Sequence, residues 1–174
     1  MKYLWLALRV FIHRFYDQFH RIFLGIPTLR RTRITEKIFV GGQYSIQKLP
    51  ELKERGVTAI VNMRETSVYN ESLYLGLKYL HLPTTDQTPP TLEDLQKGVD
   101  FISKEIAEGG KVYVHCRQGQ GRGPTMAIAY LISTGMAFEK AFEAVKAIRI
   151  FINPTPSQRE TLKEYEKSLL QKTV

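Results

Sequence analysis

The sequence predicts a single α/β domain in which helices flank a central, mostly parallel sheet. Apolar segments of strand length alternate along the chain with longer segments of helical periodicity. This alternation is typical of a parallel sheet that is covered on both faces. The 174 residues, of which 43% are hydrophobic and 24% charged, suit one folded domain with its own core.

The first elements follow from short apolar runs and the residues beside them. The run "KIFVGG", residues 37–42, is expected to form a strand and a turn. Residues 45–55 are expected to form a helix, which Gly56 ends. The continuous apolar run "VTAIVNM", residues 57–63, is expected to form a buried strand.

The second half repeats this alternation. The run "KYLHLP", residues 78–83, predicts a strand followed by a loop rich in Thr and Pro. A helix is expected over 91–108, with Thr91 as its cap and two glycines after its end. The run "KVYVHC", residues 111–116, predicts a buried strand. The remaining helices are expected at 124–133, 138–149 and 156–170.

Residues 1–26 form a separate segment that precedes the domain expected over 27–174. Apolar residues recur in this segment at alternating gaps of three and four, which is helical spacing, and the polar residues fall on the opposite side. We call these apolar positions the apolar stripe: Leu4, Leu8, Phe11, Phe15, Phe19, Ile22 and Ile26. The pattern favours a helix lying on a membrane surface. The alternative is an ordinary helix that packs its apolar stripe onto the domain.

The net charge of +8 is concentrated at the same end of the chain. Within residues 1–33, Asp17 is the single acidic residue among seven basic ones. An attraction to an anionic surface is therefore expected to be local to this end, with an anionic membrane as the partner and no nucleic acid. The longest unbroken apolar run, Tyr3 to Leu8, is too short to span a bilayer.

A single cysteine and four scattered histidines limit the other site classes. One Cys excludes an intramolecular disulfide framework and a multi-Cys metal site, which suits a reducing, intracellular compartment. The histidines form no pair at close helical spacing, so we expect neither a metal nor another cofactor.

The cysteine lies in the stretch "VYVHCRQGQGRGPTMAIAY", residues 112–130, between a strand and a helix that Pro124 helps to start. A glycine-bearing loop in this position can turn its backbone N–H groups inward to bind a phosphate-sized dianion. The same field favours the thiolate of Cys116, a nucleophile, and the planar fork of Arg122 can hold two phosphoryl oxygens. The expected phosphate-binding residues are Arg117, Gln118, Gly119, Gln120, Gly121 and Arg122. Taken singly, the Cys suits a buried strand end and the glycines suit a tight turn. Their combination with Arg122 at this spacing indicates a catalytic phosphate-binding site.

The segment "HCRQGQGR", His115 to Arg122, resembles the signature of cysteine-dependent phosphatases of the dual-specificity type, which is His-Cys, five residues, Arg. The resemblance covers about residues 33–170. It implies two-step hydrolysis through a cysteinyl-phosphate, without a metal. It also implies that His115 organises the phosphate loop, residues 116–122, and supports the thiolate.

Members of this family carry an aspartate on a loop about thirty residues before the Cys, and this residue acts as general acid and then general base. Asp86 lies thirty residues before Cys116 and follows a predicted strand, so it is our candidate. Its alternative role is that of a solvated loop residue. Glu93 and Asp94 are better explained as charges in the first turn of a helix.

Three further positions bear on turnover and loop support. Most members of the family have Ser or Thr directly after the Arg, where its hydroxyl stabilises the departing sulfur. This chain has Gly123 there, which puts efficient breakdown of the phosphoenzyme in doubt, and Thr125 is a candidate substitute. Asn153 and Gln158 lie where relatives carry a polar supporting loop, but Gln158 also fits a helix cap, which we favour.

The resemblance looks closest to the mitochondrial and bacterial relatives that act on phosphatidylglycerophosphate, and the stretch "TTDQTPPTLEDLQKGVDFI" suggests this subfamily. A dual-specificity protein phosphatase is the main expectation for function, and a phosphatase of phosphatidylglycerophosphate or a phosphoinositide is the alternative. An inactive phosphate-binding module, an RNA 5′-triphosphatase and a rhodanese-like sulfurtransferase fit less well, because Cys116, Arg122 and Asp86 occur together.

Overall fold

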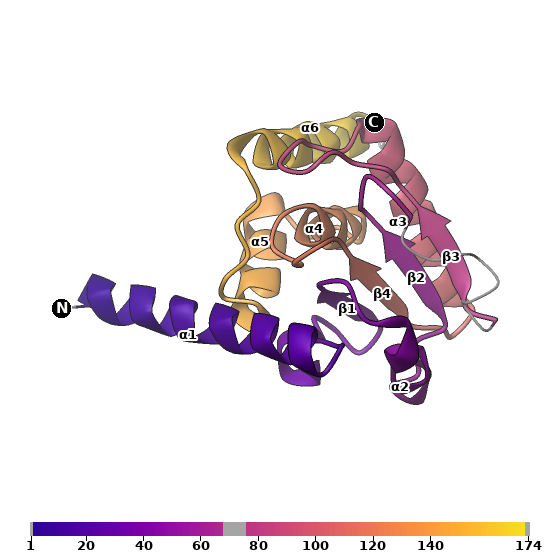
Figure 1. Cartoon of the computed structure of the whole chain (residues 1–174). Helices are drawn as coiled ribbons and strands as arrows, with labels where there is room; N and C mark the ends of the chain where they lie inside the picture. The colour runs from indigo at the N-terminus through magenta and orange to yellow at the C-terminus, as the bar shows by residue number, and fades with distance from the viewer. Residues whose placement is uncertain (1, 68–75, 173–174) are drawn as a thin grey trace.

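The computed structural model describes residues 2–67 and 76–172 and shows the predicted parallel sheet (Figure 1). All hydrogen-bonded strand pairs within the sheet are parallel. In spatial order the strands are β1 (Ile38–Gly41), β4 (Val112–His115), β2 (Ala59–Asn62) and β3 (Lys78–His81). Since the strands are parallel, their carboxyl ends lie along one edge, and β4 ends there between β1 and β2.

Helices cover both faces of the sheet, as expected (Figure 1). Alternate strand residues, such as Val40 and Val114, face a core shared with the larger helical layer. The intervening residues, such as Ile60, face a second core that includes Leu49 and Leu52. The larger layer comprises α3 (Leu92–Ala107), α4 (Arg122–Ser133), α5 (Phe138–Ile148) and α6 (Pro156–Lys172), and the other face is covered by α2 (Leu49–Glu54).

Two helix boundaries differ from the prediction for reasons that involve proline. The helix expected over 45–55 is a 3₁₀ turn at Ile46–Lys48 followed by α2, because Pro50 suits the first turn of an α-helix but not its interior. Helix α4 begins at Arg122, two residues before the predicted start. Pro124 is tolerated there because the first N–H groups of a helix have no partner within it.

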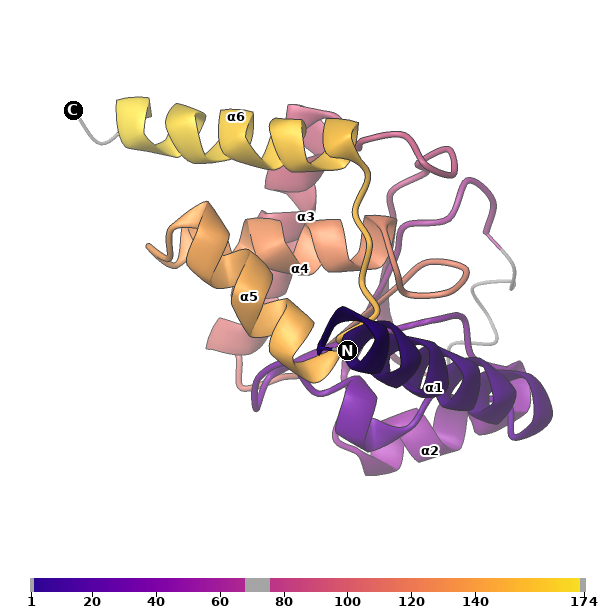
Figure 2. The ribbon, with the colours of Figure 1, turned by 90° about the vertical axis from the view of Figure 1, so that its left-hand side faces the viewer.

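The N-terminal segment forms the predicted helix, α1 (Lys2–Phe23), which extends along one side of the domain (Figures 1 and 2). Its apolar stripe is exposed from Leu4 to Ile22; Phe11 is 64% and Phe15 63% accessible. Only Ile26, beyond the end of the helix, joins the core. The interpretation that the apolar stripe packs onto the domain is therefore wrong, because the opposite, polar side of α1 makes the contact. Among the described helices, none is long and apolar enough to cross a membrane.

Candidate active site

The phosphate loop lies at the carboxyl edge of the sheet, where β4 ends and α4 begins. It forms the floor of a cavity of about 350 Å³, which most of the predicted site residues line. Gly119 and His115 do not line it. The lining residues are Asp86, Gln87, Cys116, Arg117, Gln118, Gln120, Gly121, Arg122, Asn153, Thr155 and Gln158.

The six loop carbonyls from Cys116 to Gly121 all accept hydrogen bonds from groups around the loop. His115 Nδ1 donates to the Cys116 carbonyl (3.4 Å), and the Gln43 N–H donates to the Arg117 carbonyl (3.1 Å). The side chains of Gln18 and Arg149 both donate to the Gln118 carbonyl (3.4 Å each), and Arg149 Nε donates to the Gly119 carbonyl (3.1 Å). The Asn153 N–H donates to the Gln120 carbonyl (2.8 Å), and Thr125 donates to the Gly121 carbonyl from its N–H (2.9 Å) and its hydroxyl (3.0 Å). In a planar trans peptide the N–H points opposite to the C=O. The N–H groups of residues 117–122 are therefore directed toward the centre of the loop, which makes an anion-binding nest.

The tight approach of this loop to β1 requires glycine at position 119. Gly119 has a φ of +68°, which a residue with a side chain rarely adopts. A Cβ there would also lie 2.4 Å from the carbonyl carbon of Gly41. Gly119 therefore lets the phosphate loop lie directly against the end of β1.

Arg122 is almost completely buried and is aimed at the cavity by two contacts. Its Nη1 donates to the Thr84 carbonyl at 2.7 Å, and its Nη2 pairs with Asp86 Oδ1 at 2.8 Å. Its buried Nε has no hydrogen-bond partner among the described residues. A buried guanidinium with an unused donor suits an anionic ligand that would complete its hydrogen bonds.

Asp86 lies where the spacing predicted, on the acid loop, residues 83–91, after β3. Its side chain is 65% exposed, so it can move between Arg122 and a ligand. The loop itself is held by the start of α6. Thr155 Oγ1 donates to the Gln87 carbonyl at 3.2 Å, and Gln158 Nε2 donates to the Thr88 carbonyl at 2.9 Å.

The capping role favoured for Gln158 is present. Its N–H donates to Thr155 Oγ1 at 3.3 Å, and its Oε1 accepts from the Thr155 N–H at 3.0 Å, which is a capping box. Because the same side chain reaches Thr88, Gln158 joins the helix start to the acid loop. The predicted Thr91 cap of α3 also forms, with the Asp94 N–H donating to Thr91 Oγ1 at 3.0 Å.

His115 is buried between Tyr44 and Tyr113, with ring centroids 5.5 and 6.0 Å away. Burial lowers the pKa of its imidazole to about 3, so the ring is neutral near pH 7. It therefore supplies no positive charge to a thiolate. Its contact with the Cys116 carbonyl requires the Nδ1–H tautomer and orients the first peptide of the loop.

Gly123 lies behind the cysteine and leaves room for a side chain. A Cβ there would be 3.5 Å from the Cys116 nitrogen, which is ordinary contact. Thr125 does not replace the missing hydroxyl directly, because its Oγ1 donates to the Gly121 carbonyl at 3.0 Å.

We expect Gly123→Ser to fold normally and to break down its phosphoenzyme faster than the wild type, because the new hydroxyl can stabilise the departing sulfur. Rapid-quench kinetics with an aryl phosphate would measure this step. A larger burst of released phenol in Gly123→Ser, together with equal or slower steady-state turnover, would contradict this prediction. Gly123→Ala is the matched control, since it adds the Cβ without the hydroxyl and should leave the breakdown rate unchanged.

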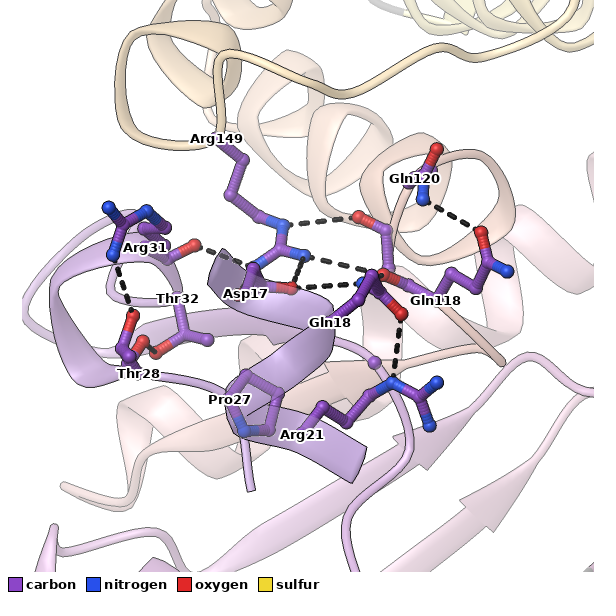
Figure 3. Close-up of polar contacts among 12 residues, drawn as sticks. Asp17, Gln18, Arg21, Pro27, Thr28, Arg31, Thr32, Gln118, Gln120 and Arg149 are labelled. Carbon is purple, nitrogen blue, oxygen red and sulfur yellow. Dashed lines mark hydrogen bonds and ion pairs between the residues drawn. The ribbon is translucent and has the colours of Figure 1, made fainter. Parts of the chain in front are cut away.

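Two residues of this network were not expected at the site from the sequence. Arg149 ends the helix expected over 138–149, and Asp17 is one of the polar residues opposite the apolar stripe. Both side chains are fully buried and paired with each other, 3.2 Å apart (Figure 3). The signal that could have pointed to Asp17 is its isolation, as the one acid in a basic segment.

The comparisons with known proteins agree with this geometry. Residues 38–168 match the family described as dual specificity phosphatase, catalytic domain, and this segment includes every strand, the acid loop and the phosphate loop. The chain belongs to the dual specificity phosphatase family. The resemblance on which the site residues were predicted is thus confirmed at the level of the family.

Relatives within the dual specificity phosphatase family include lipid and protein phosphatases. Phosphatidylglycerophosphatase and protein-tyrosine phosphatase 1 of Mus musculus is 47% identical over 96 residues, 54% of this chain and 50% of the relative. Phosphatidylglycerophosphate phosphatase PTPMT2 of Arabidopsis thaliana is 33% identical and covers 78% of this chain and 62% of its own length. Dual specificity protein phosphatase 5 of Rattus norvegicus is 34% identical, covering 78% of this chain and 35% of its own length.

Solved structures of the dual specificity phosphatase family share the fold. The crystal structure of PTPMT1 in complex with PI(5)P superimposes with a TM-score of 0.77 at 34% identity, and the match covers 82% of this chain and 97% of that one. The match spans about half the length of the mouse relative and about a third of the length of the rat relative.

Proposed function

We propose that the protein is a Cys-dependent phosphomonoester hydrolase that acts on a phospholipid phosphomonoester at a membrane surface. The observation that carries the chemistry is that the loop carbonyls around Cys116 all bond outward, which directs the loop N–H groups inward, and that Arg122 and Asp86 line the same cavity. A binding module would need these N–H groups but neither a nucleophile nor an acid. In this protein Cys116, Arg122 and Asp86 all line one cavity.

The reaction follows from these positions. The Cys116 thiolate attacks phosphorus, the ester P–O bond breaks, and Asp86 gives its proton to the leaving oxygen. The loop N–H groups and the fork of Arg122 stabilise the charge on the equatorial oxygens. Water then attacks the cysteinyl-phosphate, Asp86 takes a proton from it, and the S–P bond breaks to release phosphate.

The lipid substrate is proposed from the orientation of α1. Its polar side contacts the domain next to the phosphate loop, since Gln18 Nε2 donates to the Gln118 carbonyl at 3.4 Å. Its apolar stripe and large aromatic residues are left exposed, with basic residues such as Arg9 and Arg14 beside them. This arrangement suits an anionic bilayer. Residues 1–26 then form a membrane-surface element and residues 27–174 the catalytic domain.

Phosphotyrosine in proteins is the second candidate substrate, favoured by the similarity to dual specificity protein phosphatase 5. The same core chemistry serves both substrates. The two substrates differ in what surrounds the scissile phosphate. Binding of a soluble phosphopeptide does not require an exposed apolar stripe.

The proposal is tested by kcat/KM of the full chain on three substrates: phosphatidylglycerophosphate in anionic vesicles, a short-chain soluble form of the same lipid, and a phosphotyrosine peptide. Cys116→Ser is the blank. We expect the vesicle substrate to be hydrolysed best. A preference for the peptide would identify a protein phosphatase. If no substrate is hydrolysed above the blank, the proposal that the protein is a phosphatase is rejected.

A variant of the exposed face separates membrane binding from catalysis. Phe11→Ser together with Phe15→Ser is expected to lower kcat/KM on vesicles and to leave the soluble lipid unaffected, because neither side chain contacts the cavity. Equal loss on both substrates would show that the apolar stripe is not a membrane-binding surface.

A further inference from the structure

A buried ion pair joins α1 to the phosphate loop (Figure 3). Arg149, directly after α5, and Asp17, on α1, are both completely buried. Asp17 Oδ2 accepts from Arg149 Nη2 at 3.2 Å, and Oδ1 accepts from Nη1 at 3.4 Å. These two residues are 132 positions apart in the sequence.

The remaining donors of Arg149 all reach backbone carbonyls. Nε donates to Gly119 O at 3.1 Å, Nη2 to Gln118 O at 3.4 Å, and Nη1 to Arg31 O at 2.7 Å. With the two bonds to Asp17, the five N–H groups of the guanidinium have five partners. A buried guanidinium is costly unless a counter-charge neutralises it, so the place of Arg149 under the phosphate loop depends on Asp17.

We propose that Asp17 is a positioning residue for the phosphate loop: by neutralising Arg149, it fixes the direction of the Gln118 and Gly119 carbonyls. This inference rests on the proposed phosphate-binding role of the loop. Because each peptide is planar, holding these two carbonyls outward directs the N–H groups of Gly119 and Gln120 toward the bound phosphate. Asp17 thus acts on the bound phosphate indirectly, through Arg149 and the loop peptides that Arg149 holds.

The proposal gives α1 a role in the chemistry that its position in the sequence does not suggest. Asp17 lies outside the residues that match the family, 38–168, so the site in this chain is completed by a segment outside the family's catalytic domain. Gln18 adds a second contact from the same helix turn to the Gln118 carbonyl. The polar side of α1 is therefore used by the loop, which explains why the apolar stripe faces outward.

Asp17→Asn is the first test, in the full-length protein. We expect the Kd of inorganic phosphate, measured by calorimetry, and the KM for an aryl phosphate to rise about 10- to 100-fold, since hydrogen bonds to a charged group contribute about 1.5–3 kcal/mol. The kcat should change less, because Cys116 and Asp86 are untouched. Unchanged phosphate affinity would overturn the proposal. The calorimetric measurement needs no turnover, so it stands even if the protein proves inactive on every substrate.

A double variant separates positioning from stability. Asp17→Leu with Arg149→Met replaces the buried pair by apolar side chains, which is often neutral or stabilising for the fold. We expect this variant to unfold at a temperature near that of the wild type while phosphate affinity stays low, because the loop carbonyls have lost their donor. Recovery of phosphate affinity together with stability would show that the pair is structural only.

Glu105→Gln is the matched control. Among the residues that the structure describes, Glu105 is the other buried carboxylate with an ion pair, 2.7 Å from Lys78. It lies near Gly110, which precedes β4, and is thus at the opposite edge of the sheet. We expect this variant to lower the unfolding temperature and to leave the phosphate Kd unchanged. A weaker phosphate affinity in Glu105→Gln equal to that in Asp17→Asn would reject a specific role for Asp17.

Discussion

Arg122→Lys is expected to lower kcat/KM on every phosphomonoester by about 10³-fold or more, although it keeps the positive charge. An ammonium cannot hold two phosphoryl oxygens in one plane, and it cannot at the same time reach the Thr84 carbonyl and Asp86 as the guanidinium does. The loss should be seen in both kcat and KM, because the fork binds the ground state and the transition state.

Arg159→Lys provides the control for this substitution. Arg159 is an exposed arginine of α6 whose Nε donates to the Pro154 carbonyl at 2.9 Å, outside the cavity. Its replacement should leave kcat/KM within a factor of about two, as surface substitutions usually do little. An Arg122→Lys enzyme with nearly wild-type kcat would mean that the guanidinium is not what binds the transferring phosphoryl group.

Asp86→Asn is expected to lower kcat by about 10²- to 10⁴-fold on alkyl phosphates, because their leaving oxygen needs a proton as the P–O bond breaks. Aryl phosphates with good leaving groups should be much less affected. Steady-state kcat on one alkyl and one aryl phosphate measures this difference.

The acidic residue at the start of α3 serves as the comparison for Asp86. Asp94 is eight residues away and contacts Thr91, with its Oδ2 2.8 Å from the threonine hydroxyl. Asp94→Asn should retain kcat on both the alkyl and the aryl phosphate. An Asp86→Asn enzyme that loses activity equally on alkyl and aryl phosphates would indicate that Asp86 only orders Arg122.

The parts of the site that are contiguous in sequence could be predicted, because their geometry is local. Cys116 and Arg122 are joined by a short loop between a strand and a helix, and the glycine spacing already indicates how the backbone turns. Asp86 was predicted from the spacing that the family implies, about thirty residues before the Cys and after a strand; it lies in the same cavity as Cys116 because the carboxyl ends of parallel strands share one edge of the sheet. The strand positions were likewise readable from apolar runs, apart from residues at their ends.

The partners of the phosphate loop could not be predicted in the same way. Arg149 and Asp17 meet only after the chain has folded, and no local pattern indicates which buried carbonyls an arginine will contact. The amphipathic pattern of α1 correctly predicted two faces, but it does not say which face meets the domain. In the structure, the buried ion pair and its contacts with loop carbonyls lie on the polar side, which is the side that meets the domain.

The long separation between Asp17 and Arg149 has a consequence for biosynthesis. Asp17 of helix α1 leaves the ribosome before the catalytic domain, whereas Arg149 follows 132 residues later. Until Arg149 is synthesised, the nascent chain therefore carries an aromatic helix whose docking site is incomplete. We expect the site to be completed in a late folding step, and a nearby bilayer would shield the nascent helix from aggregation until then.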